Sequence, residues 1–186
     1  MADEITTAIE TALRSARTRP LPRSPAARMR LLVRAEKGSP RAVAARLGVS
    51  PRTVQRYLTG QIRTPGPRLA AALEREADKS WQPGIRRRAI RAAARAGITV
   101  ETRARFGFTA APGSTDDPRL RRVTETLPPD VPARLLAAHE AGADEQRLAR
   151  LLGQGLGFAY FRAHGSRAHD LDVTVPDIDS LDIGLT

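Results

Sequence analysis

The sequence contains no cysteine and only three histidines, which excludes two kinds of site chemistry. Without cysteine the chain forms neither disulfides nor thiolate metal sites. His139, His164 and His169 lack the spacing of a metal site or a catalytic triad, and we predict no metal and no cofactor. No apolar run approaches the ~20 residues that a membrane-spanning helix needs, and the acidic start Met1–Glu4 is unlike a secretory signal. We therefore expect a cytoplasmic protein that does not contact membranes.

Positive charge dominates the composition. The 186 residues include 31 Lys and Arg against 20 Asp and Glu, which gives a net charge of +11. Nearly all of these bases are arginine, whose planar guanidinium suits bidentate contacts with phosphate and guanine. Residues 170–186 hold five aspartates and no base, so residues 1–169 carry +16. The composition predicts a basic body that binds a polyanion, followed by an acidic C-terminal segment.

Hydrophobic periodicity divides the chain into two parts and predicts an α+β protein. Residues 1–96 are expected to form an all-helical DNA-binding domain that ends in a basic helix over 85–96. This helix carries five arginines and is too polar all round to belong to a core. Residues 97–186 are expected to form a small β-β-α-α-β domain for interaction with partners. Its predicted strands cover 98–108, 121–127 and the alternating segments 171–175 and 181–183, with helices over 129–141 and 144–163.

Residues 40–60 match the helix-turn-helix pattern at each position that the motif requires. Ala44 is the small residue at the crossing of the two helices, and Gly48 suits the left-handed turn between them. Apolar residues occupy the offsets that hold the helix pair together: Val43, Leu47, Val49, Val54 and Tyr57.

The second helix of this motif leaves a polar outer face that can enter the major groove of duplex DNA. The residues predicted there are Ser50, Arg52, Thr53, Gln55 and Arg56. Among them Arg52, Gln55 and Arg56 are predicted to read bases, since Arg suits guanine and Gln suits adenine. The flanking arginines predicted to hold phosphates are Arg63, Arg68, Arg86, Arg87, Arg88 and Arg91. For the 85–96 helix, a merely solvated face is an equally good interpretation.

Two segments carry a family resemblance: TVQRYLTGQI at 53–62 and TRARFGFTAAPGSTDD at 102–117, with Trp81-Gln82-Pro83 between them. Over nearly its whole length the chain resembles the telomere-protecting terminal proteins (Tpg type) of linear actinobacterial chromosomes and plasmids. The resemblance implies a non-enzymatic protein primer that is covalently attached to DNA 5′ ends. Its implied partners are telomeric DNA, a telomere-associated DNA-binding protein and a DNA polymerase, which implies a location in the nucleoid at chromosome ends.

Protein priming requires an exposed hydroxyl, and the predicted loop 109–117 contains Thr109, Ser114 and Thr115. The resemblance favours Thr115, then Ser114, as the linkage residue, with serine in place of one threonine of the family pattern. Spacing alone favours an ordinary turn in which Ser114 or Asp116 caps backbone amides. Tyr160 is another candidate hydroxyl, but its apolar neighbours predict a place in a helix core.

Two other functions share the DNA-binding prediction. One is a transcriptional regulator with a C-terminal ligand-binding or dimerisation domain, and symmetric half-sites would require a homodimer. The other is a recombinase, although the arginines near the loop show no recognised recombinase spacing. The acidic segment is expected to be an edge strand with solvated aspartates. Docking of a basic partner and shielding of the basic face are the alternatives.

Overall fold

A computed structural model describes residues 3–109, 115–161 and 172–185. The chain divides into two compact units. Unit 1 consists of Met1–Arg17 and Ile85–Thr186, and unit 2 consists of Thr18–Gly84. Helices fill unit 2, whereas unit 1 combines helices with a three-stranded antiparallel sheet, which confirms the predicted α+β class.

Unit 2 is built from four helices, three of which begin at a Ser-Pro pair. These helices are α2 (Pro25–Ala35), α3 (Pro40–Leu47), α4 (Pro51–Leu58) and α5 (Pro67–Ser80). The hydroxyls of Ser24, Ser39 and Ser50 each accept a hydrogen bond from the backbone amide three residues later, at 3.1–3.2 Å. Proline follows each serine at the first helical position, where its missing N–H costs nothing. The core of the unit consists of Met29, Leu32, Val43, Ala44, Leu47, Val54, Tyr57 and Leu73.

The two ends of unit 2 are hydrogen-bonded to each other. The indole Nε1 of Trp81 donates to the carbonyl oxygen of Arg19 at 3.0 Å. The side-chain amide of Gln82 donates to Oγ1 of Thr18 at 2.9 Å and accepts from the Thr18 amide at 3.2 Å. The Trp-Gln pair that follows α5 therefore closes the unit onto its own first residues.

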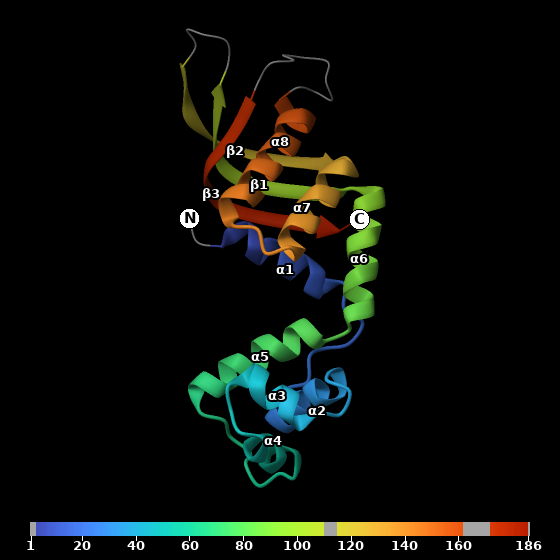
Figure 1. Cartoon of the computed structure of the whole chain (residues 1–186). Helices are drawn as coiled ribbons and strands as arrows, with labels where there is room; N and C mark the ends of the chain where they lie inside the picture. The colour runs from blue at the N-terminus through green and yellow to red at the C-terminus, as the bar shows by residue number, and fades with distance from the viewer. Residues whose placement is uncertain (1–2, 110–114, 162–171, 186) are drawn as a thin grey trace. The chain divides into compact units, whose positions relative to one another are not determined.

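Unit 1 is organised around the sheet, in which β1 (Ile98–Thr109) lies between β2 (Thr115–Leu127) and β3 (Asp172–Leu185) (Figure 1). The chain continues from β2 into α7 (Asp130–Glu140), α8 (Glu145–Leu156) and a π-helical segment, η1 (Gly157–Phe161), before β3. The predicted order β-β-α-α-β is thus observed. The two predicted segments at 171–175 and 181–183 form one strand, because register shifts in the β1–β3 ladder accommodate the residues between them.

The sheet has one buried and one exposed face, as the alternation along its strands requires. Val100, Ala104 and Phe106 of β1 are fully buried, whereas Arg103 and Arg105 are exposed. On the exposed face Arg103 pairs with Asp179 at 3.4 Å and Arg105 lies 3.9 Å from Asp177. The described part of the acidic segment is therefore an edge strand that pairs with the central strand, and Asp177, Asp179 and Asp182 are exposed, as predicted.

Two further helices, α1 (Glu4–Ser15) and α6 (Pro83–Ala96), contribute to the core of unit 1. Ile5, Ile9 and Leu13 of α1 are buried in the same cluster as the sheet residues, as is Ala93 of α6. The structure thus differs from the predicted domains 1–96 and 97–186. Periodicity revealed the apolar faces of these helices but not the core that they join. Unit 2 is an insertion between α1 and α6 of unit 1.

A small polar cluster links α1, α6 and α7 within unit 1. The carboxylate of Glu10 accepts hydrogen bonds from Nε2 of His139 at 2.7 Å and from Arg86 at 2.8 and 3.0 Å. Arg86 also donates to Glu140 at 2.6 Å. The bond from His139, followed by those from Arg86, lowers the pKa of Glu10 from 4.5 to about 2, against the opposing effect of burial.

No helix among the described residues is long and apolar enough to span a membrane.

Candidate nucleic-acid interface

The pair α3–α4 has the geometry that the helix-turn-helix pattern predicted. Gly48 closes α3 in a left-handed conformation with φ 65°, and its amide donates to the carbonyls of Ala44 and Ala45. Val43, Val54 and Tyr57 are at most 2% exposed. Ala44, at the helix crossing, is 2% exposed, so a larger side chain has no room there. The residues assigned to the interior of the motif therefore form its packed centre.

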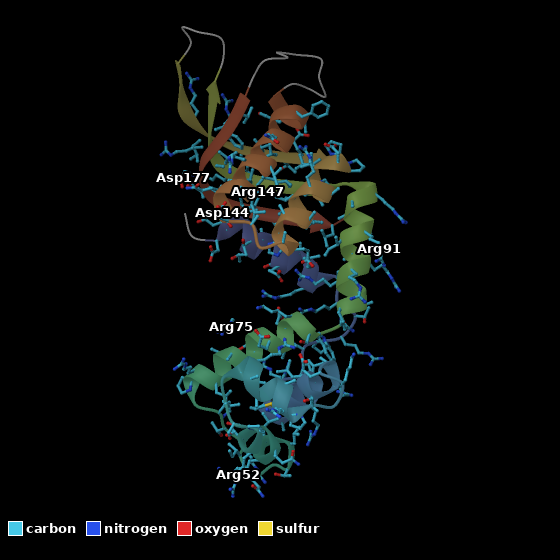
Figure 2. The ribbon with its side chains drawn as sticks, in the orientation of Figure 1. Arg52, Arg75, Arg91, Asp144, Arg147 and Asp177 are labelled. Atoms are coloured by element: carbon cyan, nitrogen blue, oxygen red, sulfur yellow. The ribbon has the colours of Figure 1, made fainter. Side chains whose placement is uncertain are left out.

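The outer face of α4 presents long polar side chains from its first two turns. Arg52, Gln55 and Arg56 are all exposed, and Figure 2 shows Arg52 directed away from unit 2. Ser50 and Thr53 have a different position, because the Ser50 hydroxyl caps the helix and lies 2.9 Å from Oγ1 of Thr53. Three of the five predicted contacts can thus reach base edges, while Ser50 and Thr53 shape the helix N-terminus, where the backbone favours a phosphate.

The positive charge of the protein is concentrated in unit 2. Unit 2 contains fourteen basic and four acidic residues, whereas unit 1 contains seventeen basic and sixteen acidic residues. No acidic residue occurs between Gly38 and Leu73, the stretch that includes α3, α4 and the exposed Arg63 and Arg68. All the formal charge of this stretch is therefore positive, which attracts a polyanion.

Three of the four carboxylates of unit 2 belong to α5, which lies on the side of the unit opposite α4 (Figure 1), and the fourth, Glu36, follows α2. Arg46 of α3 lies 2.6 Å from Glu36 and 2.5 Å from Glu76. The hydrogen bond from Arg46 lowers the pKa of Glu76, and the bonds to Glu76 and Glu36 raise the pKa of Arg46. These pairs fix α3 against α5 and the end of α2.

The predicted phosphate contacts on α6 have two different environments. All three guanidinium nitrogens of Arg86 are bonded to Glu10 or Glu140. Burial opposes the charge of this group, but the two carboxylates raise the pKa of Arg86 above its ordinary value. Arg86 is therefore a structural residue of unit 1, and we remove it from the predicted interface. Arg87, Arg88 and Arg91 are exposed, and Figure 2 shows Arg91 directed away from the sheet, so their phosphate contacts stay a prediction.

The hydroxyl-bearing segment is shorter than the predicted loop 109–117. Thr109 pairs with Thr115 at the end of the β1–β2 hairpin, and Phe108 pairs with Asp116. Thr115 thus begins β2, while Ser114 lies outside the described residues. Within the described ranges no three acidic or histidine side chains are grouped as metal ligands.

The prediction that Tyr160 lies in a helix core is wrong. Tyr160 is 41% exposed and Phe158 is 38% exposed, whereas Leu156 is fully buried. The change from α-helix to π-helix at Gly157 alters the periodicity, and the two aromatic rings leave the apolar face.

Comparison with known proteins identifies one relationship. A helix-turn-helix family (HTH_3) matches residues 29–82, from the middle of α2 to the Trp-Gln pair after α5. Neither the curated proteins nor the solved structures include a significant match. The matched segment, the exposed polar face of α4 and the basic charge agree, and the chain is a DNA-binding helix-turn-helix protein.

Proposed function

We propose that this chain is a terminal protein of linear DNA, which binds duplex DNA through unit 2 and carries a 5′ nucleotide on the β1–β2 hairpin of unit 1. The observation that carries the proposal is the position of the two segments that resemble terminal proteins. Residues 53–58 form most of the recognition helix, and in the other unit residues 102–109 belong to β1 and residues 115–117 to β2. Protein priming requires a domain that binds DNA and, apart from it, a hydroxyl that can enter the active site of a polymerase.

The proposed reaction is nucleotidyl transfer onto a protein hydroxyl. The hydroxyl oxygen attacks the α-phosphorus of a deoxynucleoside triphosphate, a P–O bond forms, and pyrophosphate leaves. A base in the polymerase active site takes the hydroxyl proton, and the polymerase supplies the metal ions that stabilise the charge. The chain is then the primer rather than the catalyst, and the 3′-hydroxyl of the linked nucleotide is extended.

The end of a hairpin suits this role for steric reasons. Hydroxyls on the covered face of the sheet, such as Thr102, are buried and cannot enter an active site. Thr115 is the first residue of β2 and pairs with the last residue of β1, so it lies at the outer end of the ladder. We therefore place the linkage on Thr115, with Ser114 as the second choice. A DNA polymerase and a telomere-associated DNA-binding protein complete the proposed complex.

The test is a labelling reaction with the full chain, an α-³²P-labelled deoxynucleotide, telomeric DNA and an extract from cells that carry a linear replicon. Label on the wild-type protein should survive denaturing electrophoresis. Thr115→Ala should abolish it, and Thr115→Ser should retain it because the hydroxyl is preserved. Thr124→Ala is the matched control, since Thr124 is an exposed threonine of the same strand. Loss of label only in Ser114→Ala would move the linkage to that residue.

A second readout distinguishes the other candidates. Phosphate esters of serine and threonine are cleaved by mild alkali through β-elimination, whereas a tyrosine ester resists it. Alkali-resistant label that disappears in Tyr160→Phe would place the linkage on η1 and not on the hairpin. Absence of any label, under conditions in which the protein binds DNA normally, would contradict the terminal-protein proposal and favour a non-covalent transcriptional regulator.

A further inference from the structure

We propose that the outer edge of β2 is a homodimer interface. Two copies of the chain join β2 to β2 in antiparallel orientation, and the two-fold axis passes through Val123. The two sheets then form one continuous six-stranded sheet. This inference does not depend on the terminal-protein proposal.

The regularity of β2 is the first observation. From Arg119 to Leu127 each residue of β2 pairs with one residue of β1, without a register shift. This nine-residue stretch contains neither proline nor glycine, and its other edge has no neighbour among the described strands. An edge strand presents a row of N–H and C=O groups to which another strand can pair.

The opposite edge of the sheet is different. β3 contains Pro176 and Gly184, and its ladder with β1 has two register shifts, whereas in β2 the one proline, Pro118, and the one register shift precede the regular stretch. Proline and bulges are the features that protect an edge strand from pairing. The structure therefore directs edge pairing to β2 and not to β3.

The charges along β2 select the register. Side chains alternate between the two faces of a strand, so the covered faces of both copies lie on the same side only when odd-numbered residues oppose odd-numbered residues. The numbers of each opposing pair then add to an even sum. With the axis at Val123, Arg121 opposes Glu125 of the second copy, and the same pair recurs across the axis. An axis at Arg122 would place two arginines opposite each other, and an axis at Thr124 would leave Arg121 opposite Leu127. Only the Val123 axis provides two ion pairs without a like-charge contact.

Exposed apolar side chains occur on β2 and on the segment that packs against it. Among the described residues the large hydrophobic side chains that are exposed are Leu120, Phe158 and Tyr160, at 41%, 38% and 41%. Leu120 belongs to β2, and the two aromatic residues belong to η1, which packs against β2. Exposed apolar groups beside an unpaired strand are typical of a surface that a partner covers. A second copy of the chain supplies a glutamate for Arg121 and an arginine for Glu125, so it is the partner that we propose.

The first test is sedimentation equilibrium of the full chain. Wild type should show a monomer–dimer equilibrium, and Glu125→Arg should weaken the dimer about tenfold because each new arginine faces Arg121 of the other copy. Arg121→Glu should weaken it similarly, and the double variant Arg121→Glu/Glu125→Arg should restore the wild-type affinity. Asp182→Arg is the matched control, since it makes the same charge change at an exposed site on β3. Restoration by the double variant also shows that the single variants lose affinity and not fold.

A cross-linking experiment tests the register, and the absence of native cysteine removes any background. With the axis at Val123, Arg122 lies opposite Thr124 of the second copy, with Cβ atoms about 4.5–5.5 Å apart. A mixture of Arg122→Cys and Thr124→Cys chains should therefore form a mixed disulfide on oxidation. Either variant alone should not form a disulfide. In that case the cysteine of one copy lies two residues away from the position opposite the cysteine of the other copy, and the two are about 8 Å apart. A monomeric wild type, equal effects of Glu125→Arg and Asp182→Arg, or cross-linking of one variant with itself would overturn the proposal.

Discussion

Replacing Glu10 with glutamine should destabilise unit 1 at neutral pH and have little effect in acid. The carboxylate of Glu10 accepts hydrogen bonds from His139 and Arg86, and these bonds lower its pKa from 4.5 to about 2. A carboxyl group whose pKa is lower in the folded state stabilises that state while it is ionised. The contribution is complete above about pH 4.5 and is lost as the pH falls towards 2. Glutamine keeps the shape of the side chain but cannot carry the charge.

The size of the effect follows from the pKa shift. A shift from 4.5 to about 2 corresponds to at most about 3.4 kcal/mol, at 1.36 kcal/mol per pH unit. The Glu10 side chain is 23% exposed, so solvent screening reduces this value and we expect about 2 kcal/mol at pH 7. Glu10 binds protons differently in the folded and unfolded states only below about pH 5. The free energy of unfolding of the variant should therefore approach that of wild type near pH 2.

Hydrogen exchange of the β1 amides measures this effect in the unit to which Glu10 belongs. The single tryptophan, Trp81, lies in unit 2, so its fluorescence during urea unfolding serves as an internal control. Glu10→Gln should accelerate exchange in β1 at pH 7 and leave the fluorescence transition unchanged. A difference between wild type and variant that is the same at pH 7 and pH 2.5 would refute the assigned electrostatic origin.

Further predictions concern unit 2. Alanine at Arg52, Gln55 or Arg56 should weaken binding to the preferred DNA sequence by about 1–3 kcal/mol each and relax specificity at one base position, as measured by fluorescence anisotropy with single-base variants of the site. Unchanged discrimination in all three variants would contradict the role of α4 as the reading helix. Gly48→Ala should lower the free energy of unfolding by about 1–2 kcal/mol, because φ is 65° there and the position is open to solvent, so only backbone strain contributes. Arg46→Met should cost about 1 kcal/mol in tryptophan-detected unfolding, since the pairs it breaks are only partly buried, and an equal loss in Arg52→Met would argue against the assigned pairs.

The helix-turn-helix could be predicted residue by residue because its determinants are local. Serine caps, first-turn prolines, the turn glycine and the apolar offsets all fall within about twenty residues, where spacing translates directly into geometry. Gly48 and Val54 are therefore found where the pattern placed them.

Long-range partners could not be predicted in the same way. The periodicity of α1 shows that Ile5 and Ile9 need a core, but nothing local indicates that the sheet, some 90 residues later, provides it. Arg86 stands in a run of arginines typical of a solvated or DNA-facing helix, yet its partners Glu10 and Glu140 are 76 and 54 residues away. The hairpin also extends further than composition indicated, since strand pairing includes Thr115 and Asp116, which sequence rules assign to a turn.

Because unit 2 is inserted into unit 1, the DNA-binding domain can be exchanged as a whole. The chain leaves unit 1 after Arg17 and returns at Ile85, and hydrogen bonds join Thr18 to Gln82. A domain whose first and last residues lie close together can be inserted in place of a short surface loop. The domain that receives it keeps its own fold. Recombination can then exchange one recognition helix for another in a single step. The DNA sequence preference of unit 2 and the properties of the sheet in unit 1 can consequently evolve independently.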